Sequence, residues 1–259
     1  MWQISIEQHQ DRIDAMDAAP VLGRNPKEGY RRACGLQFGN IAELCNRDPV
    51  FVEAYRAARQ RSLVTDDRLR NLYLLMKFHL GALQTGHIAE FGSYRGGSAI
   101  FMALVAKRLH PGLQVFAFDT YEGMPDTDAT KDVHRAGDFP MDFEELSRAV
   151  AVLGLDNLHL VKGRFDQTAG PVLDAYGPIR LAHIDCDVYE GIETAYAALK
   201  PAMVEGGYVV FDDPLVASCL GAFEAVERLV VRGDGLHAEQ VFPHLVYRYP
   251  PVPDAAAAR

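Results

Sequence analysis

Four aspartates lie in two short segments near the end of this 259-residue chain. Asp185 and Asp187 follow the apolar run IRLAHI, and Asp212 and Asp213 follow the run YVVF. Such runs are typical of strands in a parallel sheet, where ligands bind outside the carboxyl ends of the strands. Two carboxylates about 4 Å apart repel each other by roughly 4 kcal/mol at an effective dielectric near 20, so acids gathered there hold a proton or bind a cation. Oxygen ligands favour Mg²⁺, Mn²⁺ or Ca²⁺, and the segments therefore predict one hard-cation site.

A glycine-rich turn is the second candidate site. The sequence EFGSYRGGS runs from Glu90 to Ser98 and joins a predicted strand to a predicted helix. Its spacing departs from GxGxxG and no GK[ST] follows, so it matches neither the usual dinucleotide fingerprint nor the P-loop. Glycine here serves either close approach of the backbone to a ligand or tight packing of strand on helix, and the turn alone leaves both alternatives open.

Two further segments contain residues suited to binding a nucleoside. Asp119 ends the strand-like QVFAFD, at the distance from the glycine turn where such folds place an acid on ribose hydroxyls, although it would equally suit bracing the next loop. That loop, 119–138, is long enough to form a lid or a substrate wall. In the segment KGRF, Gly163 permits close approach, and Phe165 either borders an adenine or belongs to the core.

The elements that must position these residues follow a βαβ rhythm after Gly86. Short apolar runs predict strands at 87–91, 114–118, 158–161, 179–185 and 208–211. Amphipathic segments predict helices at 97–109, 141–153, 167–176, 190–201 and 217–231, preceded by helices within 51–62 and 66–84. The last stretch, 237–249, predicts an antiparallel hairpin with its connection near Pro243. We therefore expect an α/β fold with a mainly parallel sheet.

Composition and charge narrow the class of protein. Hydrophobic residues make up 49% of the chain and charged residues 24%, which is ordinary for a globular protein. We interpret residues 1–85 as a loop and helical extension packed on the core, 86–250 as the core domain and 251–259 as a disordered tail. The net charge of −9 argues against nucleic acid or an anionic membrane as a partner. The cysteines show no CxxC pairing, and the chain has neither a signal-like segment nor a long apolar stretch, so we expect a cytoplasmic protein.

Seven segments in this order resemble the macrocin O-methyltransferase (TylF-like) family over roughly 55–231: EFGSYRGGS, DTYEGMP, AGDF, KGRF, HIDCDVYEG, FDDP and CLGAFEAV. The resemblance implies a Rossmann-like class I fold that binds S-adenosylmethionine (SAM) and a divalent metal, Mg²⁺ or Mn²⁺. It also implies methylation of a sugar or polyol hydroxyl on a secondary metabolite, as in antibiotic biosynthesis. The expected partner is a small-molecule acceptor, a glycosylated natural product, and we expect a homo-oligomer.

The resemblance also assigns site residues. It places SAM at Glu90, Gly92 and Ser98, with Asp119 on the ribose. To this set we add the adjacent Phe91, Ser93 and Thr120, then Gly163 and Phe165 of the segment KGRF, and Asp185. It gives the metal to Asp185, Asp212 and Asp213, and the role of proton acceptor to Asp187. Many members read DDY where this chain has Pro214 after the aspartate pair.

Several of these residues have structural alternatives. Asp213 before Pro214 also fits a helix N-cap, as does Asp187 before a helix beginning near Glu190. His183 fits a core histidine better than a ligand. His134, in the long loop, either contacts the acceptor or is an ordinary loop histidine, and no histidine base is expected beside Val188.

Two other function classes stay open. A catechol-type small-molecule O-methyltransferase shares the fold, SAM and metal but acts on a planar diol, which usually needs an aromatic or apolar gate. A non-catalytic SAM- or nucleotide-binding protein would use the glycine turn, but its four aspartates would have no reason to converge.

Overall fold

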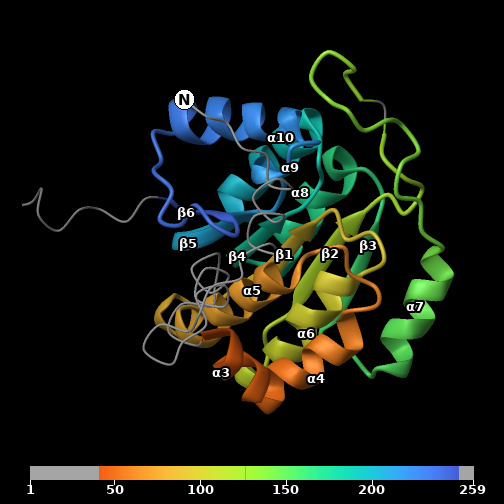
Figure 1. Ribbon diagram of the computed structural model, residues 1–259, viewed down its shortest axis with the longest axis vertical. Coiled ribbons are helices and arrows are strands. Elements are labelled where there is room, and N and C mark those ends of the chain that lie inside the picture. The colour runs from red at the N-terminus through yellow and green to blue at the C-terminus, as the bar shows by residue number, and fades with distance from the viewer. Residues whose placement is uncertain (1–40, 126, 251–259) are drawn as a thin grey trace, which may run out of the picture.

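A six-stranded sheet crosses the protein in the computed structural model, which describes residues 41–125 and 127–250 (Figure 1). The strand order is β3-β2-β1-β4-β5-β6, and all neighbours are parallel except β5 and β6. The strands are β1 (His87–Phe91), β2 (Val115–Asp119), β3 (Leu158–Lys162), β4 (Ile179–Ile184), β5 (Met203–Phe211) and β6 (Leu245–Tyr249). The order of the chain reverses between β1 and β4, and ligands of open α/β sheets bind at such a switch point.

Helices cover both faces of the sheet (Figure 1). One side carries α3 (Ile41–Arg47), α4 (Pro49–Ala58), α5 (Asp66–Phe78), α6 (Gly97–Leu109) and α7 (Phe143–Val152). The other side carries α8 (Phe165–Tyr176), α9 (Tyr189–Leu199) and α10 (Leu220–Ala225), which continues as the π-helix η5 (Val226–Gly233). Short 3₁₀ turns lie at η2 (Leu80–Ala82), η3 (Lys200–Ala202) and η4 (Asp213–Leu215).

Two hydrophobic cores lie on either side of the sheet. Successive residues of β1 alternate between them, with Ile88 in one core and Ala89 in the other, as the two-residue period of a strand requires. Phe51 of α4 and Leu72 of α5 share the first core with Phe101 of α6. Helices α4 and α5 are thus packed directly against α6, the helix that follows the glycine turn.

The mainly parallel sheet with an antiparallel C-terminal pair is confirmed, with three local differences. β5 begins at Met203, whereas the sequence predicted a start at residue 208. The prediction began late because Gly206 and Gly207 are untypical of strands, yet Gly207 pairs with Tyr249 in the sheet. The helix predicted at 217–231 is divided into α10 and η5, which apolar spacing alone does not distinguish. The predicted hairpin partner before Pro243 supplies a single bridge, Gln240 to Val246, so the strand that pairs along β6 is β5.

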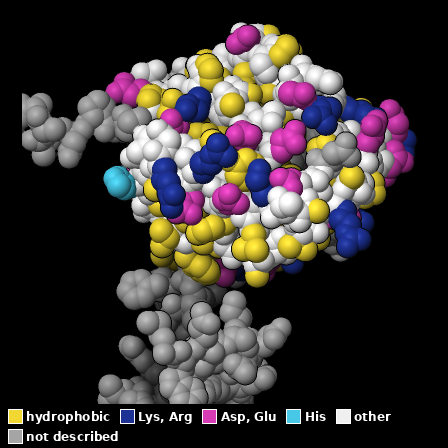
Figure 2. Space-filling model, turned by 90° about the horizontal axis from the view of Figure 1, so that it is seen from above, with side chains coloured by type: hydrophobic (Ala, Val, Ile, Leu, Met, Phe, Trp, Pro, Cys, Tyr) yellow, Lys and Arg dark blue, Asp and Glu magenta, His cyan; other side chains and the backbone are white. Residues whose placement is uncertain are grey.

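The surface carries both signs of charge. Lysine and arginine side chains alternate with aspartate and glutamate on the described part of the face in Figure 2. Among the helices within 41–125 and 127–250, none has the length and apolar character needed to cross a membrane.

Candidate functional site

A pocket of about 260 Å³ opens at the carboxyl ends of the central strands. Ten of the residues predicted from the sequence line it: Gly92, Ser93, Ser98, Asp119, Thr120, Phe165, Asp185, Asp187, Asp212 and Asp213. Three others, Glu90, Phe91 and Gly163, are not part of its wall. Glu90 and Phe91 are fully buried in the sheet, and Gly163 donates its N–H to the Asp119 carbonyl at 2.9 Å. For these three residues, direct contact with SAM stays a prediction.

The glycines of the turn are required by packing. Gly92 has a φ of 87°, and a Cβ there would lie 1.8 Å from the carbonyl oxygen of Asp185. A Cβ on Gly97 would lie 2.5 Å from the backbone nitrogen of Ser62. Glycine therefore lets β1 pass close to the residue after β4, and lets α6 begin against the segment between α4 and α5. The packing alternative is correct for both positions. Both glycines also line the pocket, so close approach to a ligand stays a prediction for them.

Asp119 braces the loops on either side of it. Its carboxylate accepts the N–H of Tyr94 at 2.8 Å and that of Tyr121 at 2.7 Å. Burial raises the pKa of Asp119 above its ordinary value, and these hydrogen bonds oppose the rise. Each oxygen of the Asp119 carboxylate retains a second lone pair. Because Asp119 lines the pocket, it has the capacity to accept hydrogen bonds from ribose hydroxyls as well.

Three carboxylates from two neighbouring strand ends converge on one side of the pocket. Asp185 follows β4, Asp212 and Asp213 follow β5, and one oxygen of each lies within 4.8 Å of the others. Burial raises the pKa of Asp185 well above its ordinary value, and repulsion from Asp212 and Asp213 raises it further. Burial raises the pKa of Asp213 in the same way, followed by repulsion from Asp187 and Asp212. An all-oxygen set of carboxylates that repel one another fits a hard divalent cation, which would relieve the repulsion.

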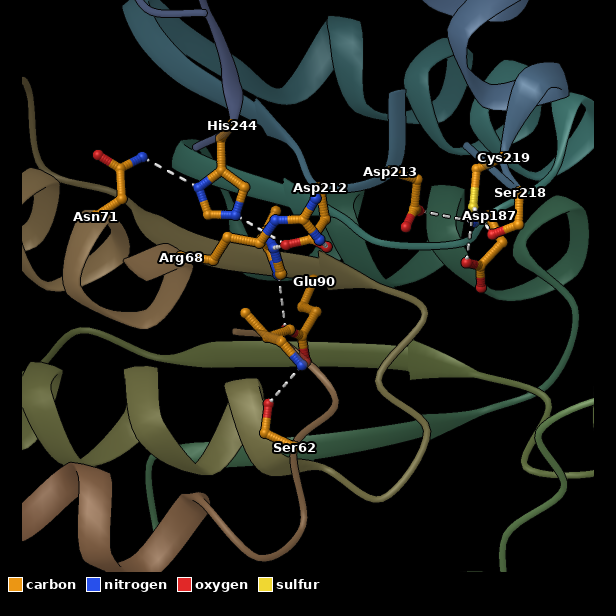
Figure 3. Close-up of polar contacts among 12 residues, drawn as sticks. Ser62, Arg68, Asn71, Glu90, Asp187, Asp212, Asp213, Ser218, Cys219 and His244 are labelled. Atoms are coloured by element: carbon orange, nitrogen blue, oxygen red, sulfur yellow. Dashed lines mark hydrogen bonds and ion pairs between the residues drawn. The ribbon is translucent and has the colours of Figure 1, made fainter. Parts of the chain in front are cut away.

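Asp212 differs from the other two because basic side chains surround it (Figure 3). Arg68 of α5 forms an ion pair with Oδ2, His244 Nε2 lies 2.8 Å from Oδ1, and His183 Nε2 lies 3.5 Å from the same oxygen. Burial would raise the pKa of Asp212, but the imidazoles of His183 and His244 hold it below its ordinary value. Asp212 is therefore the member of the cluster that stays ionised.

His183 is the buried core histidine expected from the sequence, yet it is also part of this charged group. Its side chain is fully buried, and its Nδ1 lies 2.9 Å from Glu90 Oε1. Although burial lowers the pKa of His183, the carboxylates of Asp212 and Glu90 raise it to about 9. His183 thus joins the glycine-turn strand to the aspartate cluster.

The capping alternatives for Asp213 and Asp187 are wrong. Asp213 Oδ2 accepts the backbone N–H of Asp187 at 2.8 Å, so it holds the neighbouring loop rather than the start of η4. Helix α9 begins at Tyr189, whose N–H is accepted by Asp132 Oδ1 at 3.0 Å. Asp187 has a φ of 58° and lines the pocket, and its Oδ1 lies beside Cys219 instead of the start of α9.

Asp187 has two neighbours that the sequence did not place beside it. His134 Nε2 lies 3.8 Å from Asp187 Oδ1, and Cys219 Sγ lies 3.4 Å from the same oxygen. Burial raises the pKa of Asp187, while the hydrogen bond with Cys219 and the charge of His134 oppose the rise. His134 belongs to the long loop 119–138, whose Met124 lines the pocket. The loop therefore forms a wall and brings a histidine to Asp187.

Arg68 and His244 were also missed. The pattern around Arg68 predicted only a helix, and His244 lies in a segment that predicted only a hairpin. Both lie far along the chain from Asp212, and their contacts depend on how α5 and β6 pack at the edge of the site. No local spacing carries that information.

The sheet order, the antiparallel last strand and the pocket at the switch point define the architecture of class I SAM-dependent methyltransferases. The family described as macrocin-O-methyltransferase (TylF) matches residues 55–230, and the chain belongs to this family. The resemblance drawn from the seven sequence segments is thereby confirmed.

Individual relatives are named as methyltransferases. Over 172 residues the chain is 32% identical to the 8-demethyl-8-(2,3-dimethoxy-alpha-L-rhamnosyl)-tetracenomycin-C 4'-O-methyltransferase of Streptomyces olivaceus, covering 60% of this chain and 63% of that relative. Over 208 residues it is 25% identical to the demethyldecarbamoylnovobiocin O-methyltransferase of Streptomyces niveus, covering 73% and 77% of the two chains. The calicheamicin methyltransferase CalS11 shares the fold, with a TM-score of 0.63 at 19% identity over 92% of this chain and 99% of that one.

Proposed function

We propose that this protein is a SAM-dependent and divalent-metal-dependent O-methyltransferase that acts on a hydroxyl of a sugar or other polyol moiety of a secondary metabolite. The observation that carries the proposal is the convergence of Asp185, Asp212 and Asp213 on a pocket that also contains the glycine turn and Asp119. A nucleotide-binding protein would need the turn and Asp119 but not the clustered aspartates. The rhamnosyl group in the name of the Streptomyces olivaceus relative supports a sugar-bearing acceptor.

The residues around the pocket divide into two groups. On the side of β1 and β2, Gly92, Ser93 and Ser98 would contact the methyl donor, with Asp119 accepting ribose hydroxyls through its free lone pairs. On the side of β4 and β5, the three aspartates would hold the cation. The donor and the cation would thus meet at the switch point between β1 and β4.

SAM supplies an electrophilic methyl group, and a divalent cation supplies Lewis acidity that favours loss of a hydroxyl proton from the acceptor. Asp187 then accepts that proton, and its raised pKa makes it a stronger base than an exposed carboxylate. Its backbone N–H is fixed by Asp213, which ties the position of the base to the cation ligands. The walls contributed by Met124, Phe139 and Val216 exclude water and orient the acceptor, and alignment of this kind can lower a barrier by about 7–11 kcal/mol.

A planar diol is the second candidate acceptor, and one observation favours it. Tyr94 and Phe139 both line the pocket, with ring centroids 5.5 Å apart in an edge-to-face arrangement. Such a pair would serve as the aromatic gate that a planar acceptor usually needs, and this gate was not predicted from the sequence. Parallel assays with catechols and with glycosides decide between the two acceptors.

Isothermal titration with SAM, in the presence and absence of Mg²⁺, is the first test of the proposed function. We expect SAM to bind and Mg²⁺ to bind to the SAM complex. A mass-spectrometric screen of glycosylated natural products and catechols then identifies the methylated acceptor. A protein that binds neither SAM nor Mg²⁺ would exclude the proposed function. The cytoplasmic location and the homo-oligomeric state expected from the sequence stay predictions, and light scattering tests the second.

A further inference from the structure

A chain of side-chain hydrogen bonds leads from the C-terminal segment to Asp212. Gln240 Nε2 lies 2.8 Å from Asn71 Oδ1, Asn71 Nδ2 lies 3.0 Å from His244 Nδ1, and His244 Nε2 lies 2.8 Å from Asp212 Oδ1. Figure 3 shows the last two of these contacts, with Asn71 on the far side of His244 from Asp212. We call these three side chains, Gln240, Asn71 and His244, the relay.

One backbone carbonyl fixes the direction of every hydrogen bond in the relay. Gln240 Nε2 also lies 2.7 Å from the carbonyl oxygen of Phe242, which can only accept, so this end of the glutamine must be its NH₂ group. The same NH₂ group then donates to Asn71, whose contacting atom is the oxygen. The amide nitrogen of Asn71 therefore faces His244 as a donor, and Nδ1 of the imidazole must accept.

The consequence is a single tautomer of His244. With Nδ1 accepting, the ring hydrogen sits on Nε2, which donates to Asp212 Oδ1. His244 is fully buried and Asn71 is 4% exposed, so water does not compete for these hydrogen bonds. Arg68, on the same helix as Asn71, holds the other oxygen of Asp212. Helix α5 thus orients both oxygens of this carboxylate, one directly and one through the relay.

We propose that Gln240, Asn71 and His244 are positioning residues that hold the Asp212 carboxylate in the orientation needed to bind a divalent cation. The inference rests on the proposed cation site, since without a cation the orientation of Asp212 has no ligand to serve. Residues that orient a metal ligand typically change metal affinity by about 10–100-fold when they are replaced.

The test compares the nearly isosteric variant Asn71→Leu with a matched control, Asn157→Leu. Asn157 is also a buried asparagine, at 8% exposed, and its side chain donates a hydrogen bond to the Ala103 carbonyl at 2.9 Å. It directly precedes β3 and so lies at the end of the sheet away from the pocket. Both variants lose a buried amide, so both should lose stability. Only Asn71→Leu removes the donor to His244. Gln240→Ala, at a partly exposed position, breaks the relay at its first member and serves if Asn71→Leu does not fold.

The readouts are Mn²⁺ and SAM affinities by calorimetry, and the His244 tautomer by long-range ¹H–¹⁵N correlation spectroscopy, assigned against His244→Gln. We expect wild-type His244 to carry its hydrogen on Nε2. Asn71→Leu should bind Mn²⁺ about 10–100-fold more weakly, with Gln240→Ala at the lower end of that range. Asn157→Leu should bind Mn²⁺ as the wild type does, and SAM affinity should be unchanged in all three variants.

Two results would overturn the relay alone. The first is a wild-type His244 with its hydrogen on Nδ1. The second is a wild type that binds Mn²⁺ together with variants Asn71→Leu and Gln240→Ala that bind Mn²⁺ equally well. A wild type that binds SAM but no Mn²⁺ overturns the metal part of the proposed function, and the relay falls with it. A general loss of Mn²⁺ affinity that includes Asn157→Leu would show that reduced stability, not the orientation of Asp212, is the cause.

Discussion

Replacement of Gly92 by alanine should damage the fold and the pocket together. Gly92 has a φ of 87°, a conformation that costs an L-residue about 1–2 kcal/mol. Its new Cβ would also lie 1.8 Å from the Asp185 carbonyl oxygen, a backbone atom that cannot move without shifting the end of β4. Overpacking of this kind typically costs about 1–3 kcal/mol, so the total loss in the free energy of unfolding is about 2–5 kcal/mol.

Gly112→Ala is the matched control, because it isolates the backbone part of that cost. Gly112 has nearly the same φ, 89°, but a Cβ there would meet nothing within 4 Å. The two variants should therefore differ by the steric cost alone, about 1–3 kcal/mol, which corresponds to roughly 2–12 °C in Tm for a domain of this size.

Thermal unfolding of the two variants measures this difference, and calorimetry with SAM measures the effect on the pocket. We expect Gly92→Ala to unfold at the lower temperature and to bind SAM more weakly, whereas Gly112→Ala should bind SAM normally. Equal Tm values, together with wild-type SAM affinity for Gly92→Ala, would refute the view that the close approach of residue 92 to the Asp185 carbonyl requires glycine.

Three further predictions concern the acidic residues. Asp187→Asn should keep SAM and Mn²⁺ affinity but lower the turnover number by about 10²–10⁴-fold, and near-normal turnover would exclude Asp187 as the base. Asp213→Asn should weaken Mn²⁺ binding in a calorimetric titration and also lower turnover, because Asp213 holds the backbone of Asp187; unchanged affinity would move the cation site elsewhere. The pKa values of Asp185 and Asp213 are raised well above 3.8, so between pH 3.8 and the raised pKa values the folded state binds more protons than the unfolded state. The free energy of unfolding of the cation-free protein should therefore fall as the pH rises through this range. Mn²⁺ affinity should rise over the same pH range, because the cation binds the ionised carboxylates; an affinity independent of pH would contradict the raised pKa values.

The sheet and the aspartate cluster were predictable because the residues that indicate them are adjacent in the sequence. Apolar runs that end in acids predict strands whose carboxyl ends gather at one edge, and Asp185, Asp212 and Asp213 do meet there. Phe165 shows where such reasoning stops, because the residue lines the pocket and also packs against Phe91 at a ring distance of 5.4 Å. A place in the pocket wall and a place in the core are thus compatible for Phe165, and its contact with adenine stays a prediction.

The contacts that tune the site could not be predicted, because they join segments far apart in the chain. Asp132 occupies the N–H of Tyr189, which removes the need for Asp187 to cap helix α9. His134 reaches Asp187 only because the long loop folds over the start of that helix. Arg68 likewise reaches Asp212 through the packing of α5. Periodicity reports which face of an element is buried, but it does not report which distant side chain meets it.

Methyl transfer before and after chelation tests the central claim most directly. The purified protein is treated exhaustively with a chelator and then assayed with labelled SAM and the acceptor found in the screen, before and after Mg²⁺ is added back. We expect transfer to stop on chelation and to return with Mg²⁺ in the wild type, but not to return to the wild-type level in Asp213→Asn. Unchanged methyl transfer by the chelated wild type would contradict the assignment of Asp185, Asp212 and Asp213 to a catalytic cation.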